Sequence, residues 1–175
     1  MRRLLVGLVV LAALSLTLFA GVAGAAGRAD ELAAVRAATA RFHSLAAAND
    51  AGYGLFYRCT DEAGLGAMGQ HYVNGGLVGD ALLDPAAPEA IMFEPLPGGG
   101  QRLVGVEWVV FQSVWEDAGN ATLPSLFGRP LTLVPEPNRY GIPAFYQLHA
   151  WIWKPNPAGT FEDWNPRVSC RGMGD

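Results

Sequence analysis

Three polar side chains interrupt apolar segments that are far apart in this sequence. They are His71 in residues 69–74, Glu107 in residues 103–111 and His149 in residues 146–151. A carboxylate buried without a partner costs several kcal/mol, so Glu107 needs a cation, a histidine or a set of hydrogen bonds if it faces a core. Two neutral imidazoles and one carboxylate on three strands form a ligand set for zinc, copper, manganese or iron(II). The sequence therefore predicts a divalent metal site at these residues.

Strand alternation suggests what surrounds this site. Residues two apart on a strand share a face, which places Gly105 beside Glu107 and predicts open space next to the carboxylate. By the same alternation, Gln147 and Trp151 share the face of His149. Mixed polar and aromatic groups are typical of pocket linings, and the sequence predicts ligand contacts from Tyr72, Gln147 and Trp151.

Two other interpretations of the same residues stay open. In the first, each histidine is a core residue with both ring nitrogens paired, and Glu107 accepts hydrogen bonds from Tyr72 or from a backbone turn. In the other, the three side chains hold an organic ligand without a metal. The remaining histidine, His43, falls on a predicted helix and is expected at its boundary with solvent.

The N-terminus has the pattern of a signal peptide. Arg2 and Arg3 precede a stretch without charge from residue 4 to residue 20, and Ala23-Gly24-Ala25 fits a signal-peptidase site. Cleavage after Ala25 is expected, leaving residues 26–175 as one secreted or periplasmic domain of the cell envelope without a membrane anchor. A retained anchor is the alternative, because the apolar stretch approaches the length that spans a bilayer.

The net charge limits the possible binding partners, and the cysteine content predicts a disulfide. Removal of residues 1–25 leaves ten basic residues against 16 acidic ones, a net charge of −6. Such a domain is not expected to bind nucleic acid, whose affinity depends on basic side chains. The two cysteines, Cys59 and Cys170, are expected to form a disulfide in an oxidising compartment.

The pattern of apolar residues predicts an α+β fold. An alanine-rich amphipathic helix is predicted over residues 30–49, with Asp30 as its N-cap. Short apolar runs between Gly, Pro and Asn predict strands, with Glu94 facing water or capping a turn at the end of one of them. The predicted strands are residues 55–59, 70–73, 90–94, 102–111 and 145–153. The helix is expected to pack on a mainly antiparallel sheet, open or barrel-like, with long Pro-rich loops at residues 84–88, 95–100 and 124–143 and an ordered C-terminal coil.

The sequence lacks several familiar catalytic and cofactor-binding motifs, and the proteins that it resembles have no known activity. The sequence has no Gly-x-Ser-x-Gly elbow, Walker loop, HExxH, dinucleotide fingerprint or CxxCH. Its segments at residues 66–73 (GAMGQHYV), 103–110 (LVGVEWVV) and 148–157 (LHAWIWKPNP) resemble a group of uncharacterised secreted bacterial proteins. That resemblance implies a coherent exported domain and no particular cofactor or catalytic residue.

Three functions are consistent with these features. The first is an extracytoplasmic protein that binds a divalent metal or a small ligand through His71, Glu107 and His149. The second is an enzyme in which the same metal site keeps an open coordination position for water or dioxygen. The third is a structural or interaction protein of the cell envelope, in which all three polar residues belong to the core.

Overall fold

The computed structural model describes residues 27–173. The chain divides into two units, residues 1–34 and 35–175, and residues 27–34 of the first are helical. The predicted signal peptide, residues 1–25, and its cleavage site lie outside the described residues. Within residues 27–173, no helix has both the length and the apolar character needed to cross a membrane.

The second unit begins with helical structure that differs from the single predicted helix. Residues 35–39 are helical and are followed by the 3-10 helix η1 (Ala40–His43) and by α2 (Leu45–Asp50). The chain is extended at Ser44, whose side chain accepts a hydrogen bond from the Ala47 N–H as the N-cap of α2. Serine favours this capping role over a helix interior, so the predicted helix over residues 30–49 is interrupted. Asp30 is not an N-cap, because residues 27–30 are already helical.

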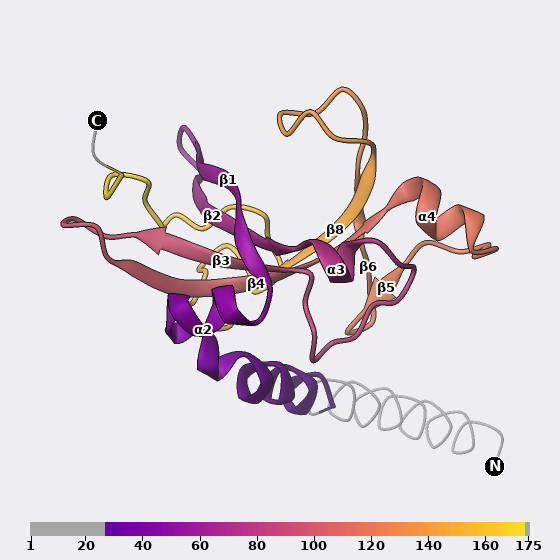
Figure 1. Ribbon diagram of the computed structural model, residues 1–175, viewed down its shortest axis with the longest axis horizontal. Helices are drawn as coiled ribbons and strands as arrows, with labels where there is room; N and C mark the ends of the chain where they lie inside the picture. The colour runs from indigo at the N-terminus through magenta and orange to yellow at the C-terminus, as the bar shows by residue number, and fades with distance from the viewer. Residues whose placement is uncertain (1–26, 174–175) are drawn as a thin grey trace, which may run out of the picture. The chain divides into compact units, whose positions relative to one another are not determined.

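A strongly curled, six-stranded antiparallel sheet forms the body of the second unit, confirming the α+β prediction (Figure 1). Its strand order is β1-β2-β3-β4-β8-β7, and β5 pairs with β6 separately. Register shifts in the β1–β2 and β3–β4 pairs mark bulges, which bend strands and increase their twist. The strands are β1 (Tyr53–Glu62), β2 (Gly66–Asn74), β3 (Ala90–Pro95), β4 (Gln101–Phe111), β5 (Ser125–Leu126), β6 (Arg129–Pro130), β7 (Thr132–Val134) and β8 (Phe145–Ala150).

All five predicted strands are present, with shifted ends. The last one stops at Ala150 instead of Trp153, where the chain turns into the C-terminal coil. The region at residues 124–143, predicted as a loop, contains the short strands β5, β6 and β7. Two short helices, α3 (Gly75–Val78) and α4 (Gln112–Asp117), follow β2 and β4 directly. Strands of two or three residues and helices of four to six are too short for a periodic pattern to reveal them.

The C-terminal coil is ordered, as predicted, and is fastened to the sheet at several points. Cys59 and Cys170 form the predicted disulfide across a sequence separation of 111 residues. In the chain-entropy model, closing a loop of this length stabilises the fold by about 5 kcal/mol. Asn165, which is fully buried, forms an antiparallel bridge with Ala67 of β2.

A buried ion pair adds a second fastening and corrects the prediction that Glu94 faces water. Glu94 of β3 is only 6% exposed. Its two carboxylate oxygens accept hydrogen bonds from Lys154 Nζ at 2.8 and 2.6 Å, and one of them also accepts from the Ser169 N–H at 3.1 Å. This carboxylate therefore joins both ends of the C-terminal coil to the sheet.

Replacement of Glu94 tests the strength of this fastening. Glu94→Gln leaves the Lys154 ammonium without its counter-charge, and we expect the free energy of unfolding to fall by about 3 kcal/mol. Chemical denaturation measures the change. Glu62→Gln is the matched control, because Glu62 is 47% exposed on the side chain and pairs with Arg139 at 3.6 Å; its expected effect is below about 1 kcal/mol. Equal effects of the two substitutions would contradict the role given to Glu94.

Candidate metal centre

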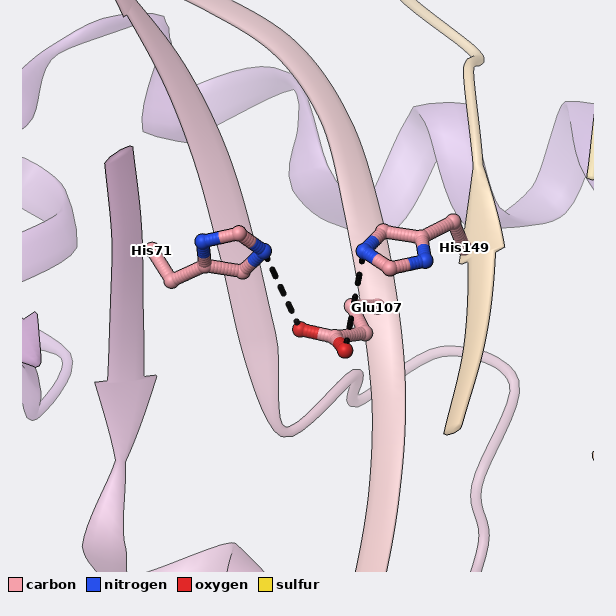
Figure 2. A group of neighbouring side chains, drawn as sticks. All are labelled: His71, Glu107 and His149. Atoms are coloured by element: carbon pink, nitrogen blue, oxygen red, sulfur yellow. Dashed lines mark ion pairs between the residues drawn. The ribbon is translucent and has the colours of Figure 1, made fainter. Parts of the chain in front are cut away.

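His71, Glu107 and His149 converge in one buried cluster, contributed by β2, β4 and β8 (Figure 2). Glu107 and His149 are direct cross-strand partners. His71 lies two strands away from Glu107, with β3 between them. Paired residues of neighbouring strands point to the same face, and this relation connects all three side chains.

A small residue lets His71 reach across β3. Ala90 of β3 pairs with Glu107 on one side and with Val73 on the other, so it occupies the face of the cluster. Because alanine carries only a methyl group, the imidazole of His71 can approach Glu107 diagonally over it. A larger side chain at position 90 would stand between the two groups.

The geometry of the cluster is close to that of a three-ligand metal site. His71 Nε2 lies 3.6 Å from Glu107 Oε2, and His149 Nε2 lies 3.6 Å from Glu107 Oε1. The three potential ligand atoms lie within 4.8 Å of one another. A tetrahedral ion with ligands at about 2.1 Å separates them by about 3.4 Å, so the two Glu107 contacts are already close to this spacing, and the wider separations, up to 4.8 Å, must contract when an ion binds.

Three histidine nitrogens lack partners within residues 27–173, and two of them, His71 Nε2 and His149 Nε2, face the Glu107 carboxylate (Figure 2). His71 Nδ1, His71 Nε2 and His149 Nε2 are buried without a hydrogen-bond partner among the described residues. Buried polar atoms in native proteins nearly always have partners, and an unmade hydrogen bond costs about 1–3 kcal/mol. The interpretation in which both histidines are fully paired core residues therefore does not fit the geometry.

Asp163 of the C-terminal coil orients one of the two histidines. His149 Nδ1 lies 3.0 Å from Asp163 Oδ1, which also accepts a hydrogen bond from Gln147 Nε2 at 3.3 Å. A carboxylate only accepts hydrogen bonds, so the imidazole proton lies on Nδ1 and the Nε2 lone pair of neutral His149 points at the cluster. This is the usual outer-shell arrangement of a metal-binding histidine.

Sequence reasoning missed Asp163 because it lies in an irregular coil. Neither periodicity nor a motif distinguishes it from the other acidic residues of the tail. The polar–aromatic composition of the His149 face predicted a pocket lining and gave no indication of a carboxylate behind the ring.

The electrostatics of the cluster follow from its burial. Burial, assisted by the nearby His149, lowers the pKa of His71 to about 3, so this ring is neutral at neutral pH. Burial raises the pKa of Glu107, with a partial opposing effect from His149. For His149, burial lowers the pKa, but the carboxylates of Glu107 and Asp163 outweigh it and the net direction is upward.

An apolar cavity of about 90 Å³ opens beside two of the three residues. His71 and Glu107 line it, whereas His149 does not. The rest of its wall is aliphatic and aromatic, apart from the hydroxyl of Tyr140. Phe56, which is 44% exposed, also lines the cavity and brings it to the surface.

The residues predicted as ligand contacts are placed differently from one another. Gln147 is tied to the site through Asp163, and the Trp151 ring is stacked at 6.4 Å from that of His149. Tyr72 follows His71 directly on β2, so its side chain points to the opposite face of the sheet, where its ring lies 5.1 Å from that of Phe93. Tyr72 is therefore not brought to the cluster.

The open space predicted beside Gly105 is absent. A Cβ atom at this position would lie 2.5 Å from Met92 Cε and 2.8 Å from the Ala150 carbonyl oxygen. Met92 pairs with Gly105 across β3 and β4 and fills the place that the glycine leaves. The cavity lies instead on the side of Val109.

A second buried carboxylate, Glu89, lies just before β3. It is 2% exposed and accepts a hydrogen bond from the Val109 N–H at 3.0 Å. Burial raises its pKa from 4.5 to about 8, and the charges of Asp80 and Glu107 add to the increase. The sequence offered no sign of this, because the position precedes the predicted strand.

The raised pKa of Glu89 predicts a pH-dependent stability. The folded protein holds the proton more tightly than the unfolded chain, so this stabilisation is complete below about pH 4.5 and is lost as the pH rises through about 8. Glu89→Gln keeps the acceptor for Val109 and removes the titration. We expect the unfolding free energy of this variant relative to the wild type to rise across that window by a few kcal/mol. Denaturation at a series of pH values measures it, and a constant difference would refute the prediction.

Glu107 is expected to contribute little to stability when no metal is bound. Its carboxylate is buried, and its polar neighbours in the described part of the chain are two imidazole nitrogens, both at 3.6 Å. An apolar residue of similar volume at such a position is often neutral or stabilising, so Glu107→Leu should leave the unfolding free energy of chelator-treated protein unchanged or raise it by about 1–3 kcal/mol. Glu94→Leu, at the well-paired carboxylate, is the contrast and should destabilise by about 3–5 kcal/mol. Strong destabilisation by Glu107→Leu would assign Glu107 to the architecture of the core.

The chain matches no protein-family model, no curated protein and no solved structure. The chemistry of the site is accordingly derived from its own side chains, namely two imidazoles and one carboxylate whose ligand atoms lie within 4.8 Å of one another.

Proposed function

We propose that this domain is an extracytoplasmic protein that binds one divalent first-row transition metal ion. The ligands are His71 Nε2, a carboxylate oxygen of Glu107 and His149 Nε2. The observation that carries the proposal is a pair of buried imidazole nitrogens that find no hydrogen-bond partner within residues 27–173 and that both face the same carboxylate at 3.6 Å.

A bound ion would balance several unfavourable features at once. It would give His71 Nε2 and His149 Nε2 a partner and would neutralise the buried charge of Glu107. The imidazole and carboxylate set suits zinc, iron(II), manganese or copper. Asp163 supports this role, because it holds His149 in the tautomer with a free Nε2 lone pair.

Export of the domain rests on two separate features. The Cys59–Cys170 disulfide is of a kind that persists in oxidising compartments. The predicted signal peptide over residues 1–25 provides the route. The net charge of −6 after its removal gives no support to a nucleic-acid partner.

A second candidate is an enzyme that uses the same ion. Catalytic zinc sites keep three protein ligands and an open position, and the described cluster offers three ligands next to a cavity. Time-dependent chemical conversion of a molecule bound at the metal would favour this candidate. Binding and release of the unchanged molecule would favour a carrier or sensor.

Elemental analysis of the exported protein tests the proposal. The mature chain is purified without chelator or polyhistidine tag and its metal content is measured by mass spectrometry. We expect close to one equivalent of a single transition metal, and its loss in His149→Ala. Asp163→Asn, which disturbs only the orienting carboxylate, should weaken metal affinity by about 10–100-fold.

His43→Ala is the matched control for histidine loss. His43 is exposed and packs its ring edge against Trp153 at 4.4 Å between centroids, away from the cluster. This variant should keep its full metal content. A folded His149→Ala protein that also keeps its metal, or a wild type that takes up none even when zinc, manganese, iron(II) or copper is supplied, would overturn the proposal.

A further inference from the structure

We infer that the apolar cavity beside the cluster binds a small monoanion with a short apolar body, such as a short-chain carboxylate, whose charged head occupies the fourth position on the ion. This inference rests on the proposed metal site and adds its ligand class. Three features of the described residues lead to it: which ligands the cavity touches, what charge the site carries, and how large and how apolar the cavity is.

The cavity marks the open side of the cluster. It is lined by His71 and Glu107 but not by His149, whose ring is held from behind by Asp163. An ion bound to the three ligands is therefore reached through the cavity, past Phe56 and Tyr140. A molecule in the cavity would meet the ion directly, without displacing a protein ligand.

Charge balance selects the head group. A divalent ion with one carboxylate and two neutral imidazoles leaves a net charge of +1 on the ligand set itself, whose residues His71, Glu107 and His149 are at most 5% exposed. The one further carboxylate nearby, Asp163, lies behind His149 at 3.0 Å, and its side chain is 40% exposed, so solvent screens its charge from the ion. An unbalanced charge in such surroundings is costly, and one additional negative charge removes it. Among the described residues that line the cavity, no lysine or arginine is present to hold a second negative charge, and none but Glu107 is acidic to hold a cationic head.

The walls of the cavity determine which apolar body the ligand can have. Val73, Val78, Val109, Ile142 and Phe145 present only hydrocarbon. The Tyr140 hydroxyl already lies 3.7 Å from Met68 Sδ, so it does not require a polar ligand. At about 90 Å³, the cavity is smaller than the engineered cavity of roughly 150 Å³ that admits benzene. A chain of a few carbons fits these limits, whereas a rigid aromatic ring does not.

Cobalt(II)-loaded protein reports on this fourth position directly. Its visible absorption responds to the number and type of ligands on the ion. The probes are butyrate, butanol and butylammonium, which share a four-carbon chain and differ in charge, and benzoate, which is wider. We expect butyrate to change the spectrum with saturation, at least tenfold more tightly than butanol or benzoate, and butylammonium to have no effect.

Two cavity-filling variants tie the binding to this cavity. Ile142→Phe and Val78→Phe each place a ring in the space and leave all three metal ligands in place. If one of the two variants does not fold, the other still provides the test. Each should weaken butyrate binding at least tenfold and change cobalt affinity by less than threefold. Leu82→Phe is the matched control, because Leu82 is 72% exposed and does not line the cavity; it should change neither affinity.

The outcomes separate the two proposals. If cobalt binds through the triad but butyrate leaves the spectrum unchanged, or binds equally well in both filled variants, the ligand inference is overturned and the metal site stands. If butanol and butyrate bind equally, charge balance does not select the head group and the inference also fails. If cobalt does not bind to the folded wild type, the metal site is overturned and the ligand inference with it.

Discussion

The burial of Glu107 between two imidazoles is the constraint around which this fold must be understood. Two other buried carboxylates, Glu94 and Glu89, provide a comparison, because both accept hydrogen bonds from protein groups. Glu94 receives two hydrogen bonds from Lys154 and one from the Ser169 N–H, and Glu89 receives one from the Val109 N–H. Glu107 instead faces nitrogen atoms at 3.6 Å that have no hydrogen-bond partners within residues 27–173. Glu94 is thus fully paired and Glu89 holds one hydrogen bond, whereas Glu107 stands where a bound ion would stabilise it.

The two sides of the cluster differ in a way that suits metal binding. Behind His149, Asp163 borders another hollow, of about 270 Å³, whose lining mixes polar groups such as Asn138, Arg139 and Gln147 with apolar ones such as Met68 and Val134. In front of His71 and Glu107, the cavity is almost entirely apolar. Tyr140 lines both spaces and so forms part of the wall between them. Solvent can thus reach the carboxylate that orients His149, while the face where a fourth ligand would bind is mostly screened from it.

Sequence patterns predicted the parts of this arrangement that depend on local periodicity. His71, Glu107 and His149 were recognisable because each interrupts an apolar strand, and alternation placed Gln147 with His149. Patterns could not reveal that Ala90 lets His71 reach across β3, because strand order is a property of the whole sheet. They also placed open space at Gly105, which in fact is filled by Met92 from the neighbouring strand. Tyr72 is a different case: alternation alone places it on the face opposite to its neighbour His71, so the sequence was sufficient to exclude this contact.

The C-terminal coil connects the stability of the fold to the chemistry of the site. Asp163 has no strand or helix to position it, yet it must stay 3.0 Å from His149 Nδ1 to hold the tautomer. It lies in sequence between two fastenings: the Lys154–Glu94 ion pair before it, and the Asn165–Ala67 bridge and the Cys59–Cys170 disulfide after it. These contacts hold the coil on both sides of Asp163 and so restrict the positions that its carboxylate can take. The disulfide and the buried ion pair thus help to position the carboxylate that orients His149.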